Sequence, residues 1–265
     1  MTDVSEGCIE ETDRVLADYP RIMNRIVRLQ PDVISANFPY DSDFPVVAVC
    51  LRDAQTAFGQ AVHALHQFCI EGAKHRSENA EAGPVMAACV ERFYVEDAAM
   101  RIYSAAEHLA NAVAMLRGLD DEALKASRVA SQWERVRKVL GRGSPRDIIV
   151  RAMNELRSDP GWRFTMRYRG QVVHNQPTLL RGLGIVYERR RRWEQTANGG
   201  YTLRVGRGDV PRHDAQDVRA SVLEACHGFL SVLEIVLNEY VEGFRGHGIA
   251  EGATGLLLRP FARGP

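Results

Sequence analysis

The chain has 265 residues, of which 45% are hydrophobic and 26% charged, a composition typical of a globular protein that buries a full core. No apolar run approaches the ~18 residues that a membrane span requires, so we expect no membrane partner. The acidic N-terminus also lacks the basic start of a signal peptide.

The charges are unevenly distributed, although the formal net charge is zero. Residues 1–100 carry 16 acids and 8 bases, residues 101–212 carry 11 and 22, and residues 213–265 carry 7 and 4. The middle segment therefore has a net charge of +11. Such a block favours a polyanionic partner, but it is equally expected where a basic helix face pairs with an acidic one inside a neutral protein.

The cysteines are odd in number, widely scattered and never arranged as a CxxC pair. They are Cys8, Cys50, Cys69, Cys89 and Cys226. This spacing argues against a disulfide framework or a zinc ribbon, and it is typical of proteins in a reducing cytoplasm. We therefore expect a cytoplasmic protein.

Hydrophobic residues at helical spacing predict an all-α fold, a helical bundle. The first expected helix begins at about residue 10. Further helices are expected at 46–74, 85–116, 120–143, 144–157, 162–176 and 214–244. A proline-rich loop is expected between residues 30 and 45. Residues 183–207 surround an Asn198-Gly199-Gly200 turn with aromatic and β-branched residues, which predicts a β-hairpin inserted into the bundle.

Arg169 and His174 combine two complementary chemistries near the end of the 162–176 helix. The planar fork of arginine fits phosphate, and histidine moves protons near neutral pH. RNA cleavage without a metal needs a proton acceptor for the 2′-hydroxyl, a proton donor for the leaving 5′-oxygen and a cation on the phosphate. The alternative is structural: Arg169 pairs with a buried acid such as Glu107, and His174 interacts with the helix end.

The spacing Arg169-x4-His174, with Asn175 and then Pro177, resembles the signature of the HEPN superfamily, small helical domains that include many bacterial RNase toxins. The resemblance implies a homodimer in which both motifs face one cleft, with no cofactor or metal. Residues 105–111 are similar to the first core helix of these domains, where an acid, here Glu107, faces the motif. Many members carry Asn, His or Asp where this chain has Gly170.

We map the HEPN-like domain to residues 85–245, with an N-terminal helical extension at 1–84 and a flexible tail at 246–265. The prediction is a metal-independent endoribonuclease in a toxin or anti-phage role, with RNA, a second copy and an antitoxin or other protein as partners. It would leave a 2′,3′-cyclic phosphate and a 5′-hydroxyl, and DNA would resist it. The alternative, favoured by Gly170, is a catalytically inactive module that binds RNA, a nucleotide or a protein.

Several arginines beside the motif are candidate RNA contacts. They are Arg167, Arg189, Arg190, Arg191 and Arg192. The run of four lies next to Trp193, which favours a role in stacking and phosphate binding. It is also compatible with a solvated hairpin edge. A second cluster, His63, His66 and Cys69, lies among apolar residues and is expected to pack in the core or in an interface rather than hold a metal.

Overall fold

The computed structural model of the chain describes residues 2–30, 34, 43–78, 83–173, 191–195, 199, 201–205, 213–245, 249–252 and 255–258. This part is mainly helical, which confirms the predicted all-α character. The helices are α1 (Thr2–Val15), α2 (Tyr19–Val27), α4 (Phe44–Glu78), α5 (Gly83–Leu116), α6 (Asp121–Ala126), α7 (Gln132–Gly143), α8 (Ile148–Ser158), α9 (Pro160–Val173) and α10 (Ala215–Arg245).

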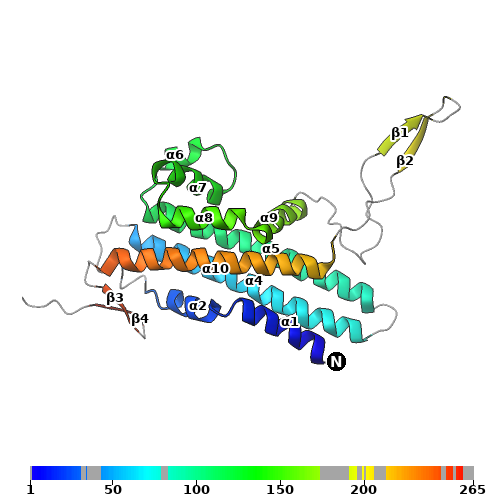
Figure 1. Cartoon of the computed structure of the whole chain (residues 1–265), viewed down its shortest axis with the longest axis horizontal. Helices are drawn as coiled ribbons and strands as arrows, with labels where there is room; N and C mark the ends of the chain where they lie inside the picture. Colours follow the sequence, from blue (N-terminus) through cyan, green and yellow to red (C-terminus); the bar gives the residue numbers. More distant parts are fainter. Residues whose placement is uncertain are drawn as a thin grey trace, which may run out of the picture.

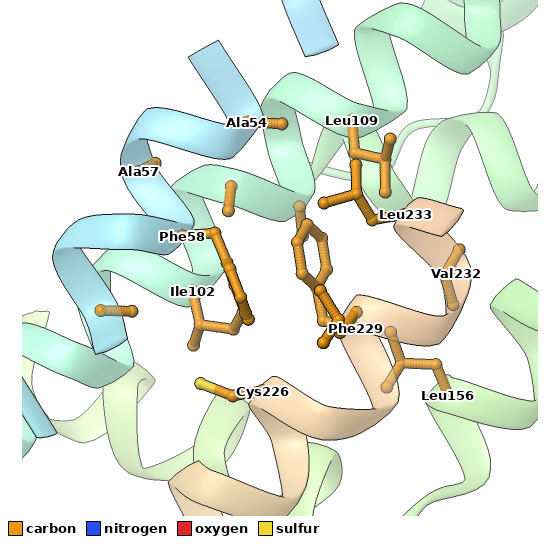
Figure 2. Packing of buried hydrophobic residues seen from close by; sticks show 14 of the residues in the cluster. Ala54, Ala57, Phe58, Ile102, Leu109, Leu156, Cys226, Phe229, Val232 and Leu233 are labelled. Atoms are coloured by element: carbon orange, nitrogen blue, oxygen red, sulfur yellow. The ribbon is translucent and has the colours of Figure 1, made fainter. Parts of the chain in front are cut away.

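Three long helices, α4, α5 and α10, run side by side and form the centre of the molecule (Figure 1). Helices α1 and α2 lie along one side of these helices, and α6 to α9 lie along the other. The core between them is aromatic and aliphatic: the rings of Phe58 on α4 and Phe229 on α10 have centroids 5.3 Å apart. Figure 2 shows Ile102 of α5 and Leu156 of α8 packed into the same cluster.

Helices α4 and α5 form the most extensive helix pair, and both bury many small side chains. The buried alanines of the two helices are Ala48, Ala54, Ala57, Ala61, Ala64, Ala87, Ala98, Ala99, Ala105, Ala106, Ala110, Ala112 and Ala114. Since α4 and α5 share one hydrophobic cluster with α10, the core is continuous across residue 84. Residues 1–84 thus contribute to the same core as residues 85–245.

Two segments that we expected to be single helices are each divided. The N-terminal segment forms α1, which begins at Thr2, and α2, which carries Pro20 in its first turn. Residues 120–143 form α6 and α7, which are separated near Arg128, whose backbone has a positive φ of 53°. Proline has no backbone N–H to donate and favours the first turn, and a positive φ ends a helix, so both breaks have local causes.

Capping residues fix the helices that surround the candidate site. Asp120, one of the two caps expected for α6, accepts a hydrogen bond from the backbone N–H of Glu122. Asp147 accepts bonds from the first turn of α8. Asp159 accepts one from the N–H of Trp162 at 2.7 Å, so α9 begins at Pro160, two residues earlier than expected.

Helix α10 is long and apolar enough, by length and composition alone, to cross a membrane, which inspection of the sequence overlooked. The buried core helix of a bundle meets the same criteria, and 56% of the apolar window of α10 is buried. Val222, Leu233 and Leu237 are among its fully enclosed residues. Its packing against α4, α5, α8 and α9 accounts for this composition.

Cys8 of α1 and Cys69 of α4 form a disulfide, a pairing that the scattered spacing of the cysteines did not predict. The two residues are 61 positions apart, and only the packing of α1 on α4 brings them together. Arg219 of α10 is buried against the same turn of α1, where it donates to the carbonyl of Cys8 and to Oγ1 of Thr12, both at 2.7 Å. A disulfide is uncommon in a reducing cytoplasm, the compartment expected from the cysteine pattern.

Four short strands form two antiparallel pairs. β1 (Arg191–Gln195) pairs with β2 (Tyr201–Val205), with Trp193 opposite Leu203 in the register. β3 (Ile249–Gly252) pairs with β4 (Gly255–Leu258), in the segment that we expected to be a flexible tail. In Figure 1 the β1–β2 pair stands apart from the helices.

Candidate anion-binding site around Arg169

The site lies on α9, which packs closely against α10. Gly161 allows this close approach, since a Cβ at that position would lie 2.6 Å from Cβ of Glu224 and 2.9 Å from the carbonyl oxygen of Ser221. One turn later, Oγ1 of Thr165 donates to the same Ser221 carbonyl at 3.2 Å. The opposite side of α9 is therefore free to carry functional side chains.

Arg169 lies near the C-terminal end of α9, with its guanidinium over the ring of Tyr103 on α5. The distance from Cζ to the ring centroid is 3.8 Å, a close cation–π contact. The Nε atom of Arg169 is buried and has no hydrogen-bond partner. Among the described residues Arg169 forms no ion pair, so the ring holds the guanidinium while its charge stays uncompensated.

Tyr103 is itself in an unusual environment. Burial raises the pKa of its hydroxyl, and the nearby Glu107 carboxylate raises it further. The phenol therefore remains neutral well into the alkaline range and keeps its electron-rich face for Arg169.

Glu107, the acid expected to face the motif, binds the N-terminus of α7. Its carboxylate accepts hydrogen bonds from Oγ of Ser131 at 2.7 Å and from the backbone N–H groups of Gln132 and Trp133 at 2.9 and 3.3 Å. These donors form the first turn of α7, where a helix favours a negative charge. Glu107 thus caps α7 from α5, and it does so without forming an ion pair with Arg169.

A cavity of about 560 Å³ opens beside Arg169, between α5, α7, α8 and α9. Its aromatic lining consists of Tyr103, Trp133 and Trp162, and the two indole rings have centroids 5.7 Å apart. Trp133 and Trp162 are buried, so they form a floor rather than a rim. Ala106 and Met166 add further apolar surface.

The cavity is strongly cationic. Four arginines line it: Arg157, Arg163, Arg167 and Arg169. Among the described residues the lining contains one acid, Glu134, and this carboxylate already binds Arg137 at 2.8 Å and Arg157 at 3.2 Å. Arg163 and Arg167 are exposed, and neither has an acidic partner in the described part of the chain. An anionic ligand is the complement of such a lining.

Two of the residues predicted for the site, Arg167 and Arg169, line the same cavity. His174, Asn175, Arg189 and Arg190 lie outside the described residues. Arg191 and Arg192 begin strand β1, of which only the backbone is described. How these residues relate to the cavity therefore stays a prediction.

Sequence reasoning missed Arg157, Arg163 and both tryptophans of the cavity. Arg163 and Arg167 are four residues apart, a spacing that places both on one helix face, and this signal was present in the sequence. Trp133 and Arg157 belong to other helices, and only the tertiary packing of α7 and α8 on α9 brings them to the same place.

The second cluster considered, His63, His66 and Cys69, does not form a joint site. Cys69 is buried, whereas His63 is exposed, so the expected core packing holds for only part of the cluster. His66 lies 3.0 Å from the carboxylate of Asp13, and Cys69 is bonded to Cys8. Within the described ranges, the structure contains no group of three or more His, Cys, Asp or Glu residues arranged to hold a metal ion.

Comparisons with known proteins do not assign the chain to a family. No family model matches it, and neither a curated protein nor a solved structure is found to be similar.

Proposed function

We propose that the protein is a metal-independent endoribonuclease of HEPN type, with Arg169 and His174 as its catalytic pair. The observation that carries the proposal is Arg169, whose uncompensated guanidinium lies on Tyr103 at the edge of a cationic, aromatic cavity. A phosphodiester of RNA neutralises that charge, and the nucleotides beside it occupy the cavity.

The proposed chemistry divides the work between the two residues. Arg169 binds the non-bridging oxygens of the scissile phosphate and stabilises the charge that develops on them. His174 follows the last residue of α9, Val173, in the sequence and acts as the proton carrier. Attack by the 2′-hydroxyl on phosphorus expels the 5′-oxygen, which leaves a 2′,3′-cyclic phosphate and a 5′-hydroxyl.

We further propose a homodimer, because a single histidine cannot at once take the proton of the nucleophile and give one to the leaving group. Two copies of His174 across a shared cleft provide both functions. In this arrangement the bundle is HEPN-like and the β1–β2 pair belongs to an insertion that follows the motif. The physiological role we propose is that of a cytoplasmic toxin or anti-phage effector, restrained by a protein partner.

A second function, RNA or nucleotide binding without cleavage, is favoured by two observations. The Nε of Arg169 is buried, so only the two terminal nitrogens of the guanidinium remain to bind a phosphate. The next residue is Gly170, which brings no polar group to the reaction. Both functions need the same cavity, and they differ in whether a phosphodiester is broken.

Incubation of RNA with the protein in excess EDTA distinguishes the two. We expect cleavage that continues in EDTA, yields 2′,3′-cyclic phosphate ends and spares DNA of the same sequence. His174→Ala serves as the matched variant, since it removes the proton carrier while Arg169 and the cavity remain. Binding of RNA without any cleavage by the wild-type protein would establish the second function instead.

A further inference from the structure

Two arginines of α9, Arg163 and Arg167, lie at the cavity without an acidic partner among the described residues. Arg163 and Arg167 are four residues apart on α9, so their side chains rise from neighbouring positions on one face of the helix. Both are exposed and both line the cavity, with no acid paired to either among the described residues. Like charges at this spacing destabilise a helix, and an anion held between them removes the repulsion.

The floor of the cavity next to this pair is apolar. Trp133 and Trp162 are 3% and 4% exposed and form its base, and Met166 is the more accessible part. Trp162 precedes Arg163 on α9, Met166 precedes Arg167, and Trp133 of α7 packs against Trp162. Nucleobases stack on aromatic side chains regardless of sequence, because every base has a π-face. The cavity thus combines an apolar floor with a cationic rim, which suits a ligand that has a flat apolar part and an anionic part.

The size and charge of the cavity further restrict the kinds of ligand that fit it. A volume of about 560 Å³ is within the range of sites that enclose a small organic ligand, and it exceeds what a lone phosphate ion fills. The acid of the lining, Glu134, is bound to Arg137 and Arg157 and so does not compete for the rim cations.

We propose that this cavity is a nucleotide subsite, in which the base lies on the Trp162–Met166 floor and its phosphate lies between Arg163 and Arg167. Arg169, which also lines the cavity, then holds the adjacent phosphodiester. The inference rests on the proposed function for the source of the nucleotide, a unit of RNA, while the chemistry of recognition rests on the cavity alone.

The test is calorimetric titration of the full chain with inorganic phosphate, adenosine, adenosine 5′-monophosphate and a short 2′-O-methyl oligonucleotide, which cannot be cleaved through its 2′-position. We expect the monophosphate to bind at least ten-fold more tightly than phosphate or adenosine, and the oligonucleotide to compete with it. Arg163→Ser should weaken both by about ten-fold or more. Arg151→Ser, an exposed arginine of α8 outside the cavity, is the matched control and should change neither.

Each outcome decides a different point. Equal affinities for phosphate and the monophosphate, or equal losses in the Arg163 and Arg151 variants, would overturn the subsite. Binding of the monophosphate without competition from the oligonucleotide would overturn its assignment to RNA and leave a free nucleotide as the ligand. Nucleotide binding by a protein that cleaves no RNA would support the subsite and refute the proposed catalysis, so the two failures are separate.

Discussion

The guanidinium of Arg169 lies 3.8 Å from the ring centroid of Tyr103, and this contact joins α9 to α5 at the candidate site. The ring positions the cation but leaves its charge available, which an ion pair with a carboxylate would not do. Positioning through a π-face thus suits a residue that binds phosphate.

Replacement of Tyr103 tests this role. Tyr103→Phe keeps the π-face, so we expect RNA cleavage close to that of the wild type. Tyr103→Leu removes it, and kcat/KM should fall about ten-fold, corresponding to about 1.4 kcal/mol of lost positioning energy. Thermal unfolding of both variants controls for stability. Equal activity of the Leu and Phe variants would show that the ring does not position Arg169.

Replacement of Glu107 separates a capping role from a catalytic one. Its carboxylate accepts three hydrogen bonds from the N-terminus of α7, so Glu107→Ala should lower the free energy of unfolding by about 1–3 kcal/mol. At a temperature where the variant is folded, its cleavage rate should be close to that of the wild type. Unchanged stability together with lost cleavage would instead assign Glu107 to the chemistry.

Much of the helical architecture can be predicted from the sequence, because apolar residues recur at helical spacing and the capping residues Asp120 and Asp147 stand where helices begin. The division of residues 120–143 was missed, since the positive φ of Arg128 has no glycine to mark it. Arg169 was found through a local motif. The stacking of Arg169 on Tyr103 was missed, because residues 66 positions apart reveal no contact in one sequence.

An ion-pair bridge at the far end of α5 should contribute more to stability than one on the surface. Arg117 joins Asp147 and Glu239 at 2.8 and 2.7 Å and is largely buried, at 23% side-chain exposure. Arg117→Met should therefore cost about 2 kcal/mol in urea unfolding. Arg21→Met is the control: Arg21 also contacts two acids but is 49% exposed, and it should cost less than about 1 kcal/mol. Equal losses would show that burial does not decide the contribution.

The cysteines should differ sharply in reactivity. Cys226 is fully buried, and burial raises the pKa of its thiol to about 12, whereas Cys89 is exposed. In the folded, unreduced protein at pH 8, iodoacetamide should label Cys89 first and leave Cys226 unmodified. Cys8 and Cys69 should become reactive only after reduction. Peptide mass analysis checks each site, and labelling of Cys8 without prior reduction would contradict the disulfide.

The most direct measurement of the central claim is a double-mutant comparison of RNA cleavage in EDTA. The wild type, Arg169→Ala, His174→Ala and the double variant are assayed at equal concentration, with circular dichroism to confirm the fold. Because both residues serve one transition state, we predict that each single change lowers the rate by about 100-fold or more and that the double change adds little. Cleavage at the wild-type rate by both folded single variants would contradict the account.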